Sequence, residues 1–245
     1  MNKRWLSSVY SFAVYERDRW VAHQARSLPP GSKVLDVGAG PCLYRRLFAH
    51  CDYKTQDFMQ YEGSAIGPLA DKDMWRYGKI DYVCDATAIP VPDASFDAVL
   101  CTEVLEHVPE PIRVVNELSR ILRKGGRLWL TAPLGCGLHQ EPHHYYGGYT
   151  PYWYRRFLSE AGFEQINVIP NGGFFRHYGQ ESGRFSAWID PRRVPGIARI
   201  VLAPVWLLTL PWFRLILPLM CHYLDRLDKH CAFCVGYHVT ATKLS

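Results

Sequence analysis

The chain has 245 residues, of which 48% are hydrophobic, and a formal net charge of +5. This length fits one large domain or two small ones with a packed core, and we expect a single domain, residues 1–245, that carries an insertion. The basic residues are scattered, so no nucleic-acid partner is expected, although the charge favours an anionic membrane surface. Eight cysteines without a disulfide-framework spacing favour reduced thiols in a cytosolic protein.

The first 30 residues form a separate segment. Between about residues 5 and 27, apolar residues recur mostly at helical spacing, and Pro29-Pro30-Gly31 then interrupt the pattern. Serines and charged residues break up the apolar part, so the segment is a poor signal peptide. We expect a helical cap over residues 1–30 that packs on the edge of a sheet.

A glycine-rich turn follows the first expected strand. Lys33 to Cys42 reads KVLDVGAGPC, in which a short apolar run ends in an acid and two glycines. Glycines at the carboxyl end of a buried parallel strand let the backbone turn tightly and approach a nucleotide-type cofactor. The dinucleotide pattern G-x-G-x-x-G would need a third glycine where Leu43 stands, which argues against a dehydrogenase.

A second acid is expected close to this turn. Residues 43–49 predict a helix, and residues 53–57 predict a second strand that ends in Asp57, 17 residues after Gly40. A carboxylate at that strand end can accept hydrogen bonds from both ribose hydroxyls of a cofactor. For Asp57 considered alone, a solvated acid at a strand end is the alternative interpretation.

The first strand and its turn resemble motif I of the class I S-adenosyl-L-methionine-dependent methyltransferases. Asp36, Gly38 and Gly40 match the acid and the first two glycines of the pattern D/E-x-G-x-G-x-G. Cys42 stands at the third glycine position, where a small side chain can pack helix against strand. The resemblance covers about residues 30–135, within an expected cofactor-binding core of residues 31–170, and implies S-adenosyl-L-methionine as the cofactor.

The third expected strand strengthens this resemblance. Residues 80–84 end at Asp85 and Ala86, which match the family position where a carboxylate and the adjacent backbone amide bind the adenine edge. A turn at residues 89–97 then leads to a fourth strand. Acids at three successive strand ends are the specific signal. Residues 63–78, which come before, predict a loop with one short helix and no assigned function.

Three potential metal ligands follow the fourth strand, in the sequence TEVLEHV. Glu103, Glu106 and His107 are spaced i, i+3 and i+4, so they would share one helical face at the ligand-binding edge of the sheet. Glu103 could contact the cofactor or the acceptor. Alternatively, all three could bind a divalent metal ion, as a similar E-x-x-E-H does in some small-RNA and quinone-precursor methyltransferases. In the third interpretation, which we prefer, Glu106 and His107 brace the loop by hydrogen bonds.

The rest of the core alternates helices and strands. Residues 109–123 predict an amphipathic helix, 127–131 a fifth strand, 150–162 a helix and 163–169 a sixth strand. The alternating run at 235–242 predicts the seventh strand, which the family inserts antiparallel beside the sixth. The expected fold is therefore α/β, a three-layer sandwich around a seven-stranded, mostly parallel, Rossmann-like sheet.

The loop after the fifth strand is the expected acceptor site. This histidine loop, residues 138–150, reads LHQEPHHYYGGYT. Imidazole has a pKa suited to a general base, and aromatic faces stabilise a sulfonium cation. The candidate catalytic residues are His139, His143, His144 and Glu103, and the candidate walls of the acceptor pocket are Tyr145 and Tyr146. Any one of the histidines alone could instead be an ordinary surface histidine.

A strongly apolar insertion, residues 171–230, separates the sixth strand from the last segment, residues 231–245. Residues 200–213 carry no charge, and prolines recur at 204, 211 and 218. We expect the insertion to be too short and too broken for a membrane-spanning helix. Flanking tryptophans and arginines favour an interfacial or re-entrant hairpin, with a buried helical cap as the alternative.

Two cysteines close to the last strand form half of a zinc or redox motif. Cys231 and Cys234 lie near His222 and His230, but the sequence contains no second C-x-x-C. Thiols packed at the start of the strand are therefore the preferred interpretation.

The predicted reaction is transfer of the sulfonium methyl group to an oxygen or nitrogen acceptor. We expect a lipid-linked or hydrophobic small molecule, such as a glycolipid, isoprenoid or quinone precursor, and a cytoplasmic protein peripherally associated with a membrane. A second hypothesis is a soluble acceptor, with the insertion as a lid or oligomer surface. A third is a cofactor-binding interaction protein without turnover, against which the three strand-end acids argue.

Overall fold

The computed structural model describes residues 3–63 and 75–244. Within them the chain divides into two units: residues 3–16 with 170–235, and residues 17–63 with 75–169 and 236–244. Most of the loop expected at 63–78 lies outside the described residues.

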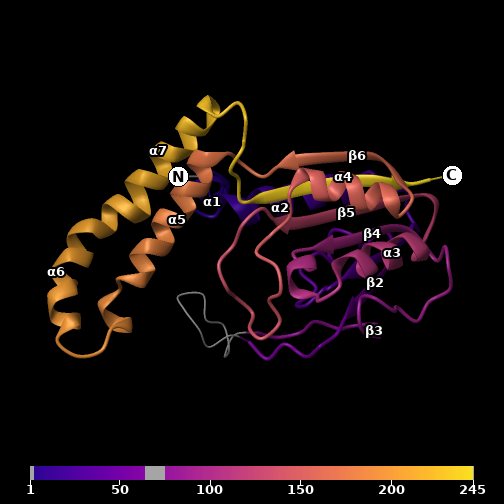
Figure 1. The fold of residues 1–245 in the computed structure, drawn as a ribbon, viewed down its shortest axis with the longest axis horizontal. Helices are drawn as coiled ribbons and strands as arrows, with labels where there is room; N and C mark the ends of the chain where they lie inside the picture. Colours follow the sequence, from indigo (N-terminus) through magenta and orange to yellow (C-terminus); the bar gives the residue numbers. More distant parts are fainter. Residues whose placement is uncertain (1–2, 64–74, 245) are drawn as a thin grey trace. The chain divides into compact units, whose positions relative to one another are not determined.

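The larger unit is built on one seven-stranded sheet (Figure 1). In chain order the strands are β1 (Lys33–Val37), β2 (Asp52–Asp57), β3 (Tyr82–Val83), β4 (Phe96–Thr102), β5 (Leu122–Pro133), β6 (Phe163–Pro170) and β7 (Gly236–Lys243). They lie in the order β3-β2-β1-β4-β5-β7-β6. Strands β1 to β5 pair in parallel, whereas β7 runs antiparallel to β5. The predicted mixed sheet, with its last strand inserted antiparallel next to β6, is confirmed.

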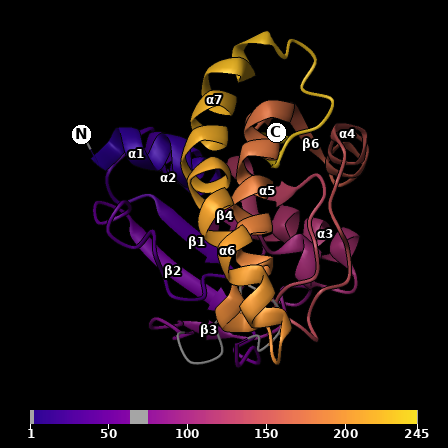
Figure 2. The same cartoon turned by 90° about the vertical axis from the view of Figure 1, so that its left-hand side faces the viewer.

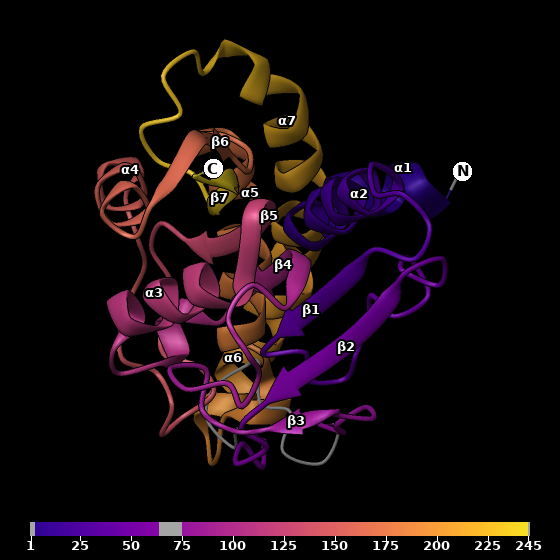
Figure 3. The same ribbon diagram turned by 90° about the vertical axis from the view of Figure 1, so that its right-hand side faces the viewer.

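Helices cover both faces of this sheet (Figure 3). α2 (Phe12–Arg26) lies on one side, and α3 (Pro111–Ile121) and α4 (Pro151–Glu160) lie on the other. Trp129 of β5, only 1% exposed, packs in one cluster with Val34 of β1 and Val21 of α2. Because alternate side chains of a strand point to opposite faces, the remaining apolar residues of β4 and β5 face the buried stripe of α3. The expected three-layer α/β sandwich is therefore confirmed.

The segment after the glycine turn differs from its prediction. Residues 41–50 form successive turns instead of the helix expected at 43–49. Their amides bond to carbonyls three residues back, as Leu47 does to Tyr44 at 2.8 Å. Cys42 has a φ of 57°, a left-handed conformation that an α-helix does not accommodate. The chain therefore starts this connection in a tight turn.

The smaller unit is a helical hairpin joined to the first helix of the chain. Its elements are α1 (Lys3–Tyr10), α5 (Phe174–Trp188), η2 (Pro191–Arg193), α6 (Ala198–Pro211), the π-helical turn η3 (Trp212–Ile216), α7 (Leu217–Leu224) and η4 (Asp225–Leu227). The hairpin has two arms, α5 and the continuous helix of α6, η3 and α7, and they run side by side in both Figure 1 and Figure 2. Among the described residues, one helix, Ala198–Leu227, is long and apolar enough to cross a membrane by length and composition.

The expectation that prolines break this apolar segment is wrong. A π turn carries the helix past Pro211, and the amide of Leu217 bonds to the carbonyl of Trp212, five residues back. In that register the carbonyl of Phe213 would pair with Pro218, which has no N–H. The hydroxyl of Ser182 on α5 donates to this carbonyl instead, at 2.9 Å. The neighbouring helix thus satisfies the group that proline leaves unpaired.

Small residues on α5 allow the two arms to pack closely. A Cβ atom added to Gly179 would lie 3.2 Å from the Cα atom of Pro218. At the base of the hairpin, the Asp225 carboxylate accepts hydrogen bonds from the amides of Gly173 and Arg176, at 3.1 and 3.0 Å. These bonds cap the first turn of α5. The hairpin therefore has its own internal support.

The N-terminal segment does not form one cap as expected. Residues 3–16 belong to the smaller unit, where Asn171 donates to the carbonyl of Ala13 at 3.1 Å and Arg176 lies 3.6 Å from Glu16. Residues 17–26 of α2 belong to the larger unit and cover its sheet.

Candidate active site

The larger unit contains a cavity of about 420 Å³ at the carboxyl ends of β1, β2 and β4. Open α/β sheets bind ligands at this edge, where successive strand ends meet. All the residues predicted from the sequence to contact the cofactor line the cavity: Asp36, Gly38, Gly40, Asp57, Asp85 and Ala86.

The glycine turn needs glycine for two separate reasons. Gly38 and Gly40 have φ angles of 67° and 48°, in the left-handed region that disfavours a side chain. A Cβ atom at Gly38 would lie 2.3 Å from Cγ2 of Val104, and one at Gly40 would lie 3.2 Å from the ring of Trp75. Both positions therefore keep the backbone exposed to the cavity.

Asp57 is held at the end of β2 by backbone amides. Its Oδ2 accepts from the amide of Gly40 at 2.9 Å, and its Oδ1 accepts from the amide of Met59 at 3.0 Å. Burial raises the pKa of the carboxyl, and these hydrogen bonds oppose the rise. Since each carboxylate oxygen has two lone pairs, Asp57 can still accept hydrogen bonds from a pair of hydroxyls in the cavity.

Asp36 is the more deeply buried acid of the site. Burial raises its pKa to about 7, the hydroxyl of Tyr53 donates to its Oδ2 and opposes that rise, and the nearby Asp57 charge adds to it. An acid with this pKa is partly protonated near neutrality. Asp36 therefore adds less negative charge to the cavity than its residue type suggests.

Gln56, which no sequence pattern singled out, supports the glycine turn. Its Oε1 accepts from the amide of Gly38 at 3.2 Å, and its Nε2 donates to the carbonyl of Cys84 at 2.6 Å. The residue is 1% exposed and connects the end of β1 with the end of β3. Its position next to Asp57 at a strand end was the only signal for it.

A second missed feature is a charge pair in the cavity wall. Nη1 of Arg17, on α2, lies 3.9 Å from Oε1 of Glu103, and its Nε donates to the hydroxyl of Tyr44 at 3.1 Å. Oε1 of Glu103 also accepts from the hydroxyl of Thr131 at 2.7 Å. One cation and one anion therefore face the cavity side by side. No sequence pattern pairs α2 with the end of β4.

The helical face expected for Glu103, Glu106 and His107 does not form. Glu103 has a φ of 54°, and only a three-residue 3₁₀ turn, η1 (Leu105–His107), follows it. Glu103 and His107 line the cavity, whereas Glu106 is 1% exposed. Neither carboxyl oxygen of Glu106 has a hydrogen-bond partner among the described residues. Burial, with the Glu103 charge in addition, raises its pKa.

The structure divides the histidine loop into two groups. His143 and Tyr145 line the cavity, and the His143 ring meets Phe58 edge-on with 4.9 Å between ring centroids. His139, His144 and Tyr146 do not line the cavity. Backbone bonds dock the loop on η1, since the amide of Tyr145 donates to the carbonyl of Glu106 at 2.9 Å.

The remaining histidines gather around His107. Ring nitrogens of His107, His139 and His144 lie within 4.8 Å of one another, the only such group of three potential ligands in the part of the chain that the structure describes. Burial lowers the pKa of His107 to about 4 and also lowers that of His144. The predicted set of Glu103, Glu106 and His107 is not assembled as such, and His107 takes part in a different cluster.

The cysteines before β7 form no comparable group. Cys234 is buried and Cys231 is partly buried, and the two are not joined in a disulfide. Within residues 3–63 and 75–244, they are not gathered with His222 or His230 into a set of three potential ligands.

The chain is similar to known methyltransferases in the sequence of its central part and in its fold. Residues 35–130 match a family model described as Methyltransferase domain. The chain is 32% identical over 173 residues to the sarcosine/dimethylglycine N-methyltransferase of Halorhodospira halochloris, covering 64% of this chain and 60% of that one. It is 34% identical over 131 residues to the phosphatidylethanolamine N-methyltransferase of Cereibacter sphaeroides, covering 51% and 63%. The chain thus spans less than two thirds of each of these relatives.

A solved structure shows the same fold. Phosphoethanolamine N-methyltransferase 2 of Haemonchus contortus, in complex with S-adenosylhomocysteine, superposes with a TM-score of 0.53 at 16% identity, covering 94% of this chain and 52% of that one. The sheet order and the cavity at its carboxyl edge define a Rossmann-like class I fold. With the match over residues 35–130, this fold confirms the resemblance to the class I S-adenosyl-L-methionine-dependent methyltransferases seen in the sequence.

Proposed function

We propose that this protein transfers a methyl group from S-adenosyl-L-methionine to an oxygen or nitrogen of a lipid-linked or hydrophobic small molecule at a membrane surface. The observation that carries the proposal is the meeting of the glycine turn, three strand-end acids and His143 in one cavity.

Each part of the cofactor has a chemically matched partner in that cavity. Asp57 accepts hydrogen bonds from the ribose hydroxyls, and Asp85 with the amide of Ala86 binds the adenine edge. The pair formed by Arg17 and Glu103 matches the carboxylate and ammonium groups of the methionine part, because opposite charges attract in a partly desolvated site. S-adenosyl-L-methionine is therefore the cofactor that this set of groups favours.

The acceptor would enter from the side of the histidine loop. His143 would take the proton of an acceptor O–H or N–H as that atom becomes methylated. S-adenosyl-L-methionine would supply the methyl group and leave as S-adenosylhomocysteine, so the products would be the methylated acceptor, S-adenosylhomocysteine and protonated His143. Phe58 and Tyr145 also line the cavity, and aromatic rings of this kind would stabilise the cationic sulfonium before transfer.

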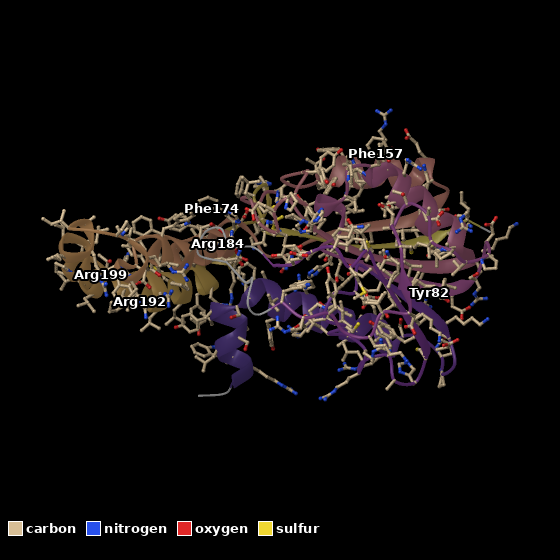
Figure 4. All side chains as sticks on the ribbon, turned by 90° about the horizontal axis from the view of Figure 1, so that it is seen from below. Tyr82, Phe157, Phe174, Arg184, Arg192 and Arg199 are labelled. Carbon is tan, nitrogen blue, oxygen red and sulfur yellow. The ribbon has the colours of Figure 1, made fainter. Side chains whose placement is uncertain are left out.

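The hairpin supports a membrane location. Apolar side chains of its α6–α7 arm are exposed to an unusual extent, as for Leu208 at 82%. Arg192 and Arg199 lie near its tip (Figure 4), and the Arg192 guanidinium stacks 5.4 Å from the ring centroid of Trp206. Arginine and tryptophan are the residues that a bilayer interface selects.

The second arm favours lying along the membrane over crossing it. α5 carries Arg176, Glu181 and Arg184, of which the last two pair at 2.8 Å. Charged side chains are energetically unfavourable in the hydrocarbon core of a bilayer but are stable at the level of the headgroups. We therefore propose a cytoplasmic protein whose hairpin lies in the interface plane.

The names of two relatives support different acceptor classes. The phosphatidylethanolamine N-methyltransferase supports a lipid acceptor, and the sarcosine/dimethylglycine enzyme supports a soluble amine. The exposed apolar arm favours the lipid class, because a soluble acceptor does not require it.

Product analysis with cofactor labelled on its methyl group tests the proposal. Purified full-length protein is incubated with a membrane extract and, separately, with the soluble extract of the same cells. We expect label in the organic-solvent fraction of the membrane reaction and none with Gly40→Arg, which blocks the cavity. Label confined to water-soluble products would refute the lipid acceptor, and no label in either fraction would refute turnover.

A further inference from the structure

Three imidazoles from two separate segments converge next to the cavity. His107 comes from η1, whereas His139 and His144 come from the histidine loop. Their ring centroids are 4.6 to 5.6 Å apart, with each pair of rings nearly perpendicular. Since the ligand nitrogens all lie within 4.8 Å of one another, one point exists that is within about 2.8 Å of all three. Zinc–nitrogen bonds of about 2.0–2.1 Å are reached by moving each ring inward by roughly 0.8 Å.

The Nδ1 atom of each ring is already hydrogen-bonded to the backbone. Nδ1 of His107 lies 2.6 Å from the carbonyl oxygen of His143, Nδ1 of His139 lies 2.9 Å from that of Gly137, and Nδ1 of His144 lies 3.2 Å from that of His139. A carbonyl can only accept, so each Nδ1 donates and each Nε2 keeps its lone pair. This is the support that metal-binding histidines require, because it fixes both the tautomer and the ring orientation.

Two further ligand types border the cluster. Sγ of Cys136 lies 3.9 Å from Nε2 of His144, and Oε1 of Glu106 lies 3.7 Å from Nε2 of His107. Glu106 is 1% exposed, and within the described residues its carboxyl oxygens have no hydrogen-bond partner, so a group to satisfy them is lacking. A metal ion bound by the three imidazoles would place a positive charge next to the unpaired carboxyl oxygens of Glu106.

We infer that His107, His139 and His144 form a binding site for a transition-metal ion of the zinc type, with Cys136 as the fourth ligand and the buried Glu106 carboxyl next to His107. Imidazole and thiolate are the ligands that zinc prefers, and four of them close a tetrahedral site. The ion would fasten the histidine loop to η1. It would thereby hold His143, whose carbonyl is already bonded to His107, at the wall of the cavity. Metal binding at this cluster does not depend on the identity of the methyl acceptor.

Binding is measured on the full-length protein, first stripped with chelator and then titrated with Zn²⁺ in competition with a chromophoric chelator. We expect one equivalent to bind. Titration with Co²⁺ then reports the geometry, because four-coordinate cobalt absorbs strongly in the visible range and a thiolate ligand adds a charge-transfer band. Failure to bind one equivalent, or the weak spectrum of six-coordinate cobalt, would overturn the inference without any variant.

Variants assign the ligands. His139→Ala combined with His144→Ala should abolish stoichiometric binding while the circular dichroism spectrum stays that of the unmodified protein. The matched control is His50→Ala, an exposed histidine outside the cluster, which should bind metal normally. Retention of one tightly bound equivalent by the double variant would contradict the assignment.

The thiol is tested separately. Cys136→Ser should remove the thiolate charge-transfer band of the cobalt form, whereas Cys231→Ser should keep it. A band that persists in Cys136→Ser would show that the sulfur ligand is a different cysteine.

Discussion

The amide of Gly40 donates a 2.9 Å hydrogen bond to the carboxylate of Asp57, so the glycine turn after β1 is joined directly to the acid at the end of β2. The same carboxylate is expected to accept hydrogen bonds from the ribose hydroxyls of the cofactor. Asp57→Ala should therefore weaken S-adenosyl-L-methionine binding by at least about tenfold, since a hydrogen bond to a charged group contributes roughly 1.5–3 kcal/mol.

The matched control for this change is Asp52→Asn, at the opposite, exposed end of the same strand. It should leave the dissociation constant, measured by calorimetry, within about twofold of the unmodified protein, a span that corresponds to less than 0.5 kcal/mol. Equal affinities for Asp57→Ala and the unmodified protein would remove Asp57 from the cofactor site.

His143 is the histidine of its loop that faces the cavity. His143→Ala should lower kcat by about 10²- to 10⁴-fold, the usual contribution of a general base, and should leave cofactor affinity nearly unchanged. Single-turnover transfer of labelled methyl groups measures the effect. Full turnover by the alanine variants of His143, His139 and His144 alike would exclude the loop from catalysis.

The raised pKa of Asp36 makes a prediction about stability. Its carboxyl titrates near pH 7 in the folded protein and near pH 4 in the unfolded chain, so the folded state disfavours the charged form. The free energy of unfolding should therefore fall as pH rises from about 4 to 7. Asp36→Asn removes this loss, and the gain over the unmodified protein should grow to roughly 4 kcal/mol at most above pH 7.

Urea denaturation at several pH values measures that difference. Glu106, a second buried acid with a raised pKa, leaves some pH dependence in the variant, so only the difference between the two proteins is informative. A difference that does not change between pH 4 and 8 would mean that the Asp36 pKa is not raised.

The exposed arm of the hairpin predicts membrane binding that resists salt. Burying each apolar side chain such as Leu208 or Leu215 contributes roughly 1.5 kcal/mol or more, which exceeds the roughly 1 kcal/mol per arginine from anionic lipids. The protein should therefore float with liposomes even at high salt, where charge attraction is screened. Leu208→Glu with Leu215→Glu should release it.

The control for flotation is Val83→Glu, which changes an apolar side chain of similar exposure, 62%, on β3 of the larger unit. It should float normally. A soluble, monodisperse unmodified protein would instead favour a lid or an oligomer surface.

The features of the fold and site that depend on local sequence pattern could be predicted from the sequence. The apolar strands, the glycine turn and the strand-end acids predicted the sheet and gathered Asp36, Asp57 and Asp85 correctly in one cavity. The helix predicted after β4 from residue spacing is not formed. Glu103 has a left-handed backbone conformation, and a short 3₁₀ turn follows it, which residue spacing does not predict.

Contacts between distant segments could not be predicted. The Arg17–Glu103 pair joins α2 to β4, and the cluster of His107 with His139 depends on how a loop folds back on η1. The prediction that prolines break the apolar segment was also wrong. The hydroxyl of Ser182 on the neighbouring helix satisfies the carbonyl that proline leaves unpaired, and the sequence does not indicate this contact.

Calorimetric titration with S-adenosyl-L-methionine tests the central claim most directly, with Gly38→Ala and Gly31→Ala as a matched pair. Both glycines have a positive φ, but a Cβ atom at Gly38 would lie 2.3 Å from Val104, whereas one at Gly31 meets nothing within 4 Å. We expect one cofactor per chain with micromolar affinity, lost in Gly38→Ala and retained in Gly31→Ala. A preference for a nicotinamide cofactor, or unchanged affinity in Gly38→Ala, would contradict a methyltransferase cofactor site at this turn.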